Sequence, residues 1–157
     1  IRVIVFRGVP VMAMMRCATH SSDGKANLHQ GAVGVGIDIG TGQSICAVQH
    51  NRVVSQHPDT KMYFDKLTIP LWQQVLELAS GCAGMAGLDY LGVDIVLDRL
   101  RGPMLLELNA RPGLAIQVAN QAGLRHRLLA AEKIADSCDD DGEKIALARS
   151  QFAAHTS

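Results

Sequence analysis

The sequence predicts an α+β fold in which an antiparallel sheet carries helices packed on one face. Alternating apolar residues joined by short turns indicate hairpins at the start of the chain, over residues 44–56 and over residues 91–109. After Pro70, apolar residues recur with the period of a helix, and Gly84 and Gly87 are expected to end that helix. Shorter helical patterns follow at Leu114–Ala122 and Leu124–Ala135.

The first hairpin is expected to turn at Arg7–Pro10. Pairing across this turn places Arg2 opposite Met15 and Arg16 beside Ile1. Two guanidinium groups near one strand end can bind a phosphate or an acyl phosphate. The alternative is that both arginines run their aliphatic stems along a sheet edge and leave their charges in water.

The next segment predicts a strand over Ala32–Gly42 with one apolar face and one glycine face, which indicates close packing against a neighbouring element. Before it, Asn27 is expected to hydrogen-bond a phosphate or to complete a metal site. His29 is interpreted as a structural hydrogen-bonding residue rather than a general base. His50 and His57 have no partner at ligand spacing and are interpreted as surface residues.

The hairpin over residues 91–109 carries the most specific pattern. A four-residue loop sets Asp98 opposite Pro103, and counting back along both strands sets Asp94 opposite Glu107. Side chains alternate between the faces of a strand. One face is therefore expected to be apolar, and it comprises Val93, Ile95, Leu97, Met104, Leu106 and Leu108.

Asp94, Glu107 and Asn109 share the other face of this hairpin. Opposed carboxylates, with Cβ atoms roughly 5 Å apart, destabilise a strand pair. A cation between the two acids and the amide would remove this repulsion. Oxygen ligands of this kind are typical of Mg²⁺ and Mn²⁺ sites. The alternative is a half-exposed hairpin whose acids face water while Asn109 caps the turn before Pro112.

Two motifs resemble a known superfamily. Gly-Val-Asp94 followed by Glu107-Leu-Asn109-Ala-Arg-Pro-Gly113 resembles the metal-binding signature of ATP-grasp ligases. Lys25-Ala-Asn-Leu-His-Gln-Gly31 resembles a segment of the RimK-like glutamate ligases. From about Ile1 to Leu129 the chain is similar to the alpha-L-glutamate ligase-like, or sugar-transfer-associated, ATP-grasp proteins.

The resemblance implies the C-terminal lobe of the ATP-grasp fold over residues 1–135. Residues 136–157 lie outside the resemblance. They are expected to form a tail that starts with acidic residues and contains a helix at Glu143–His155. This tail need not be well ordered. Because Ile1 begins inside a strand, the chain is expected to be a fragment of a longer protein. The adenine pocket and the lid of the family would then precede Ile1, and the fragment alone would be weak or inactive.

The resemblance also implies a reaction, the ATP-dependent joining of a carboxylate to a glutamate-like amine through an acyl phosphate. Asp94, Glu107 and Asn109 would hold Mg²⁺ or Mn²⁺ on the phosphates of ATP. A non-catalytic module that keeps the fold and a metal-dependent phosphohydrolase remain the alternatives.

Four further roles follow for polar residues around that site. Arg2 and Arg16 would stabilise the transferred phosphate or the acyl oxygen, with Arg2 also contacting the nucleotide. Asn27 would help to position the phosphates. Arg111 would contact the acceptor or pair with Glu107.

Composition narrows the classes of partner. The formal net charge is zero and aromatic residues make up 4% of the chain, so neither an electrostatic footprint for nucleic acid nor a base-stacking platform is visible. No apolar run is long enough to span a bilayer, and no signal peptide is recognisable. The four cysteines are scattered, which favours a reducing cytoplasm over a disulfide framework. A homo-oligomer is compatible with the sequence.

Overall fold

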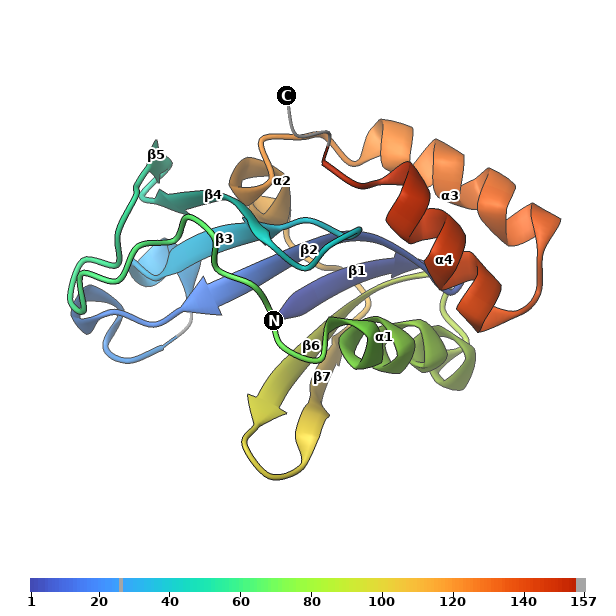
Figure 1. Ribbon diagram of the computed structural model, residues 1–157, viewed down its shortest axis with the longest axis horizontal. Coiled ribbons are helices and arrows are strands. Elements are labelled where there is room, and N and C mark those ends of the chain that lie inside the picture. The colour runs from blue at the N-terminus through green and yellow to red at the C-terminus, as the bar shows by residue number, and fades with distance from the viewer. Residues whose placement is uncertain (26, 155–157) are drawn as a thin grey trace.

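The computed structural model describes residues 1–25 and 27–154 and contains a seven-stranded sheet in the order β5-β4-β3-β2-β1-β6-β7, with all neighbours antiparallel (Figure 1). The strands are β1 (Arg2–Phe6), β2 (Val9–Cys17), β3 (Val33–Ile37), β4 (Ser44–Gln49), β5 (Arg52–Val53), β6 (Tyr90–Asp98) and β7 (Gly102–Asn109). The helices are α1 (Trp72–Ala86), α2 (Ala115–Ala119), α3 (Arg125–Ser137) and α4 (Asp141–Gln151), with short 3-10 helices η1 (His20–Ser22) and η2 (Leu28–Gln30).

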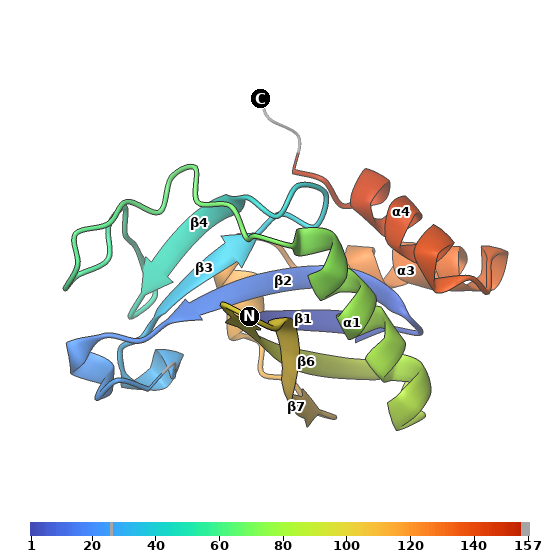
Figure 2. The ribbon, with the colours of Figure 1, turned by 60° about the horizontal axis from the view of Figure 1, so that its bottom comes forward.

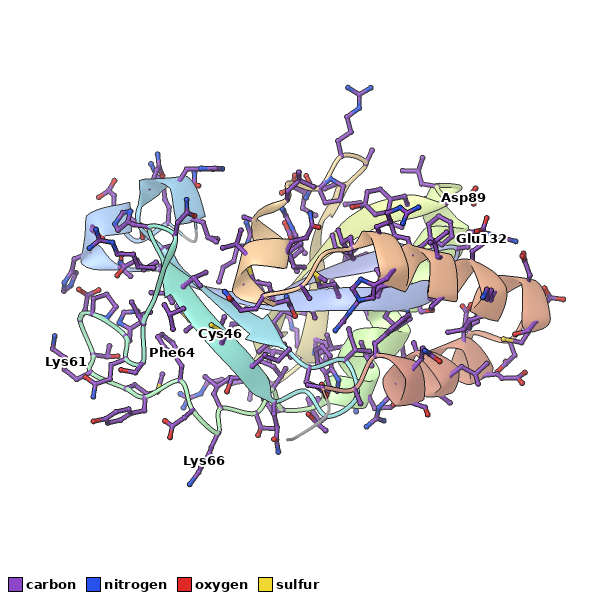
Figure 3. All side chains as sticks on the ribbon, turned by 90° about the horizontal axis from the view of Figure 1, so that it is seen from above. Cys46, Lys61, Phe64, Lys66, Asp89 and Glu132 are labelled. Carbon is purple, nitrogen blue, oxygen red and sulfur yellow. The ribbon has the colours of Figure 1, made fainter. Side chains whose placement is uncertain are left out.

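The helices cover both faces of the sheet. The predicted α+β class and antiparallel sheet are confirmed, but the expectation of helices on one face is wrong. Helix α1 lies on one face, and α2 lies on the other, next to β3 (Figures 2 and 3). A helix of five residues can sit there because β3 presents glycines instead of side chains to it.

Gly36 in β3 is the point where α2 comes closest to the sheet. A Cβ atom at this position would lie 2.3 Å from the carbonyl oxygen of Ala119. The Gly36→Ala substitution should therefore displace α2 and lower the free energy of unfolding by about 2–3 kcal/mol, the usual cost of overpacking. Chemical denaturation measures this loss.

Gly84 supplies the matched control, because it lies inside α1 and a Cβ atom added there would have no neighbour within 4 Å. Gly84→Ala should stabilise the protein by about 0.5–1 kcal/mol through the better helix propensity of alanine. Equal effects of the two substitutions would contradict the close contact at Gly36.

The β1–β2 hairpin corrects one predicted register. Its turn contains only Arg7 and Gly8, both with positive φ (49° and 83°), so Phe6 pairs with Val9. A bulge then shifts the register between Ile4 and Val5, and Arg2 pairs with Met14 instead of the predicted Met15. A slip of one residue exchanges the two faces of a strand.

The β6–β7 hairpin is also bulged. Asp98 pairs with Gly102 and not with Pro103, but an irregularity between Asp94 and Ile95 restores the predicted pairing of Asp94 with Glu107. Beyond the bulge, Met104 lies on the face of Asp94, and Leu105 lies on the face that was expected to be apolar throughout. That face is only partly covered on the edge strand β7, where the Leu106 side chain is 66% exposed.

The C-terminal helix packs into the common core. The side chain of Asp140 caps α4 by accepting a hydrogen bond from the N–H of Glu143 (2.8 Å), and Ile145 and Phe152 are buried. His155, the last residue predicted for this helix, lies outside the described residues. The domain boundary at residue 135 stays a prediction, although elements on both sides of it share one core. Among the described helices, none has the length and apolarity needed to cross a lipid bilayer.

Candidate functional site

An aspartate held between two arginines lies at the centre of the candidate site. Arg2 at the start of β1 is the register partner of Asp94 in β6. The Arg2 guanidinium donates from Nε to Oδ1 (2.8 Å) and from Nη2 to Oδ2 (2.6 Å) of the Asp94 carboxylate. The Nη2 atom of Arg16 lies 3.0 Å from the same Oδ2.

The bulge in the first hairpin makes this arrangement possible. Because Arg2 pairs with Met14, and side chains alternate along a strand, Arg16 lies on the same face as Arg2. With the predicted pairing to Met15, the two guanidinium groups would have been on opposite faces. The sequence predicted that the two arginines lie near each other but did not reveal how they meet, and their role as site residues stays a prediction.

The charges of the two arginines control the ionisation of Asp94. Burial of the Asp94 carboxyl opposes its ionisation, but the hydrogen bond from Arg2 and the positive charges of Arg16 and Arg2 outweigh it, so its pKa is lowered. The hydrogen bond to Asp94 in turn raises the pKa of Arg2.

Asp94 shares its charge between two guanidinium groups, and the carboxylate of Glu107, which is paired with Asp94 across the strands, balances the formal charge of the site. The donors of the arginines are not all used. The Nε atom of Arg16 is buried and has no hydrogen-bond partner within the described part of the chain. A buried donor that stays unpaired costs about 1–3 kcal/mol. Arg16 therefore keeps a hydrogen-bonding donor that no described residue uses.

Asn109 and Glu107 extend the site on β7. The Asn109 amide donates from Nδ2 to Oδ2 of Asp94 (3.3 Å), and within the described residues its oxygen has no hydrogen-bond partner. Glu107 pairs with Asp94 across the two strands, is exposed, and has no ion pair among the described residues. The structure thus brings the three predicted metal ligands together on one face.

The donor set fits a hard cation that is only partly coordinated by protein. In the described residues, no group of three or more His, Cys, Asp and Glu side chains could hold a metal ion by itself. The trio offers two carboxylates and one amide oxygen, and Asp94 already shares its charge with the arginines. Mg²⁺ typically accepts one or two carboxylates together with phosphate oxygens and water, and this set meets that requirement.

Two predicted site residues lie apart from the hydrogen bonds and ion pairs of this cluster. Asn27 is exposed and caps η2, where its side-chain oxygen accepts a hydrogen bond from the N–H of His29 (3.1 Å). Its neighbour Ala26 lies outside the described residues. Arg111 is exposed beyond the end of β7, and within the described residues it forms no ion pair with Glu107. Their roles toward ligands stay predictions.

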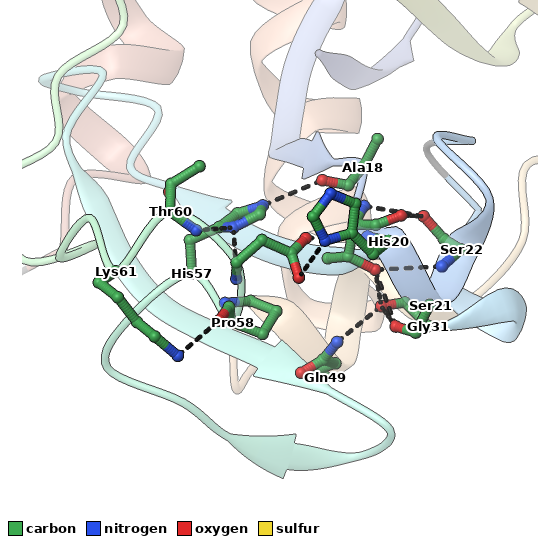
Figure 4. A network of polar contacts seen from close by, with 12 residues as sticks. Ala18, His20, Ser21, Ser22, Gly31, Gln49, His57, Pro58, Thr60 and Lys61 are labelled. Atoms are coloured by element: carbon green, nitrogen blue, oxygen red, sulfur yellow. Dashed lines mark hydrogen bonds and ion pairs between the residues drawn. The ribbon is translucent and has the colours of Figure 1, made fainter.

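His57 belongs to a polar network that connects the segment after β2 with the segment after β5 (Figure 4). Its ring is 7% exposed, so its assignment to the surface is wrong. Nε2 lies 2.9 Å from the carbonyl oxygen of Ala18, and Nδ1 accepts hydrogen bonds from the N–H groups of Asp59 (3.2 Å) and Thr60 (3.3 Å). The ring thereby joins two loops that lie far apart in the sequence.

Replacing His57 by alanine should lower the free energy of unfolding by about 1–3 kcal/mol, because three backbone groups lose their partner in a mostly buried place. His126→Ala is the matched control, since His126 is exposed on α3. Thermal denaturation of both variants measures the difference. A loss no larger for His57 than for His126 would show that water replaces these hydrogen bonds.

Comparison with known proteins identifies one family. The family model described as sugar-transfer associated ATP-grasp matches residues 1–133. No curated protein matches the chain. The match covers β1 to β7, and it therefore includes every residue of the charged site described above.

Proposed function

Since the chain belongs to the sugar-transfer associated ATP-grasp family, we propose that its charged site serves an ATP- and Mg²⁺-dependent ligase that joins a carboxylate to an amine. Membership of an ATP-grasp family implies nucleotide binding and ligase-type activity. The observation that carries the finer proposal is Asp94, which touches two guanidinium groups on one side and the Asn109 amide on the other.

The proposed reaction forms two anionic groups in succession, and each is stabilised by positively charged groups of the protein beside it. The substrate carboxylate attacks the γ-phosphorus of ATP, the bond to the ADP oxygen breaks, and an acyl phosphate forms. The amine then attacks the acyl carbon, the bond from that carbon to the phosphate oxygen breaks, phosphate leaves, and the attacking nitrogen loses one proton to give the amide. Charge develops on the transferred phosphoryl group and then on the acyl oxygen.

Arg2 and Arg16 would carry the positive charge in both steps. Arg2 is held rigidly by two hydrogen bonds to Asp94, so its remaining N–H groups are aimed without further loss of rotamer freedom. Arg16 has a single contact with Asp94, so its guanidinium is less constrained than that of Arg2 and is the better candidate to follow the transferred group. Preorganised donors of this kind stabilise developing charge strongly.

Asp94, Glu107 and Asn109 would hold the metal ion. When bound, Mg²⁺ would neutralise the charge on the phosphates of ATP. Glu107 and the Asn109 oxygen are available to it, whereas Asp94 must share its oxygens with the arginines. This shared carboxylate would fix the spacing between the metal ligands and the anion-binding groups. Asn27 and Arg111 would approach the ligands from the neighbouring loops.

Trapping with hydroxylamine tests the proposal. With Mg·ATP, a carboxylate substrate and hydroxylamine, an acyl phosphate yields a hydroxamate, and one ADP is released per hydroxamate. A glutamate-like amine should compete with hydroxylamine and reduce the yield. Hydroxamate formation should disappear when either Mg²⁺ or the carboxylate is left out.

The same assay separates the rival functions. Phosphate release without hydroxamate, at a rate independent of any carboxylate, would identify a phosphohydrolase and refute the ligase. Nucleotide binding without release of ADP under any of a broad set of carboxylates would indicate a non-catalytic module.

A further inference from the structure

The side chain of Leu28, at the start of η2, packs onto the sheet where β3 has no side chain. A Cβ atom added to Gly34 would lie 2.7 Å from Cδ2 of Leu28 and 3.1 Å from Sδ of Met14. Leu28 therefore occupies the space that a larger residue in β3 would fill, and the Met14 thioether borders the same space. This contact of Leu28 with Gly34 is called the Leu28 anchor below.

The two residues that border this space are the cross-strand partners of the two site arginines. Met14 pairs with Arg2 across β1 and β2, and Gly34 pairs with Arg16 across β2 and β3. Directly opposed residues of antiparallel strands share one face of the sheet, and their Cα atoms lie about 4.5–5.5 Å apart. The Leu28 anchor thus lies on the sheet face that carries the charged site, one strand away from the backbone of Arg16.

The turn that contains η2 is held at both ends. The Leu28 anchor holds its start. At its end, the carbonyl oxygen of Gly31 accepts hydrogen bonds from Oγ1 of Thr19 (2.9 Å) and from Nε2 of Gln49 (2.7 Å), as Figure 4 shows. Asn27 directly precedes Leu28, so their Cα atoms are about 3.8 Å apart. The Leu28 anchor is therefore the contact that sets the position of Asn27.

Asn27 has only half of its amide group in use. Its Oδ1 accepts the capping hydrogen bond from the N–H of His29 (3.1 Å), whereas its Nδ2 donates to no described residue. In the sheet order β3-β2-β1-β6-β7, the strands of Arg2 and Arg16 lie between β3 and the two strands that carry the proposed metal ligands. A row of phosphates laid across these strands would meet the metal ligands first, then the arginines, and finally Asn27.

We propose that Leu28 is a positioning residue of the nucleotide site, which holds Asn27 where its Nδ2 group donates to a phosphate oxygen of Mg·ATP. Leu28 itself touches no ligand in this arrangement and acts only through Asn27. The inference deepens the proposed function and rests on it for the placement of the nucleotide over the charged site. Its test is the affinity for Mg·ATP, which requires no ligation step.

A double-mutant cycle between Asn27 and Leu28 tests whether one acts through the other. Asn27→Ser keeps an oxygen that can cap η2 but removes the Nδ2 donor. It should weaken Mg·ATP binding about tenfold, the usual effect of losing a hydrogen bond to a charged group. Leu28→Ala should weaken binding about threefold to tenfold in the native protein, but not at all in the Asn27→Ser background. Titration calorimetry measures each affinity.

Gly34→Ala disturbs the Leu28 anchor from the side of the sheet. The added Cβ atom meets the ends of two flexible side chains and no backbone atom, so the fold should tolerate it while Leu28 is displaced. The substitution should weaken Mg·ATP binding, and it should add no loss to that of Leu28→Ala. Leu28→Met conserves volume and should restore most of the affinity. Gly84→Ala, which meets no atom within 4 Å, is the control and should bind normally.

The outcomes separate this inference from the ligase proposal. Additive losses in the cycle, full affinity of Asn27→Ser, or full affinity of Gly34→Ala would overturn the positioning role. Circular dichroism verifies that each variant is folded, and if Leu28→Ala is not, Gly34→Ala in the Asn27→Ser background completes the cycle. Coupled losses of affinity in a protein that forms no hydroxamate would support the positioning role and refute the ligase. Hydroxamate formation by a protein whose Mg·ATP affinity ignores Asn27→Ser would do the reverse.

Discussion

Replacing Asp94 by alanine is expected to lower the free energy of unfolding by about 3–5 kcal/mol. The substitution leaves two guanidinium groups facing each other across adjacent strands, with Arg2 only 15% and Arg16 only 23% exposed. Removing one partner of a buried ion pair is strongly destabilising because the remaining charge is uncompensated. Here two charges lose the same partner, and they also repel each other. Urea denaturation measures the effect.

Asp136→Ala is the control for this prediction. Asp136 also accepts a 2.7 Å hydrogen bond from an arginine, Arg7, but both side chains are largely exposed, at 61% and 36%. Exposed ion pairs contribute little to stability. Asp136→Ala should therefore cost much less than Asp94→Ala. Similar costs would show that the buried position of Asp94 does not determine its contribution.

The same carboxylate predicts a dependence on pH. The lowered pKa of Asp94 in the folded protein means that its contribution to stability is complete above its unfolded pKa of about 3.9. The contribution is lost as the pH falls through the lower folded value. Stability of the native protein should decline more steeply below about pH 4 than that of Asp94→Ala. Parallel pH profiles would contradict the proposed ion pairs.

The sequence predicted the composition of the site better than its geometry. Alternating residues and short turns suffice to identify both hairpins. The predicted pairing of Asp94 with Glu107 started from a wrong register at the turn, and it holds because the bulge at Asp94–Ile95 compensates for that error. The bulges at Ile4–Val5 and Asp94–Ile95 leave no local pattern, because they depend on how the strands pack against their neighbours. They nevertheless decide which side chains share a face.

The position of α2 illustrates the same limit. The glycine face of the third strand predicts close packing, and the contact of Gly36 with Ala119 agrees with it. The glycine pattern does not tell which element packs against the strand. The helix that does so, α2, has only five residues, and its periodic pattern is too short to predict which of its faces contacts the sheet.

Replacing Glu107 by glutamine is expected to reduce Mg·ATP-dependent ligation by about a hundredfold or more, since metal charge stabilisation contributes several kcal/mol to such reactions. Stability should be unchanged or slightly raised. Glu107 is exposed, forms no ion pair among the described residues, and faces the carboxylate of Asp94 across the strand pair. Removing one of two opposed like charges relieves a repulsion.

The two acids of the site should therefore be distinguishable by experiment. Replacing Asp94 should lower stability, whereas replacing Glu107 should lower activity and leave stability intact. Hydroxamate formation and urea denaturation on the same preparation of Glu107→Gln measure both quantities. Glu132→Gln on α3 is the control, because Glu132 is exposed and is not part of the site. Raising the Mg²⁺ concentration should restore part of the activity of Glu107→Gln, because a weakened metal site still fills by mass action. A large loss of stability, or full activity at low Mg²⁺, would show that Glu107 does not hold the metal.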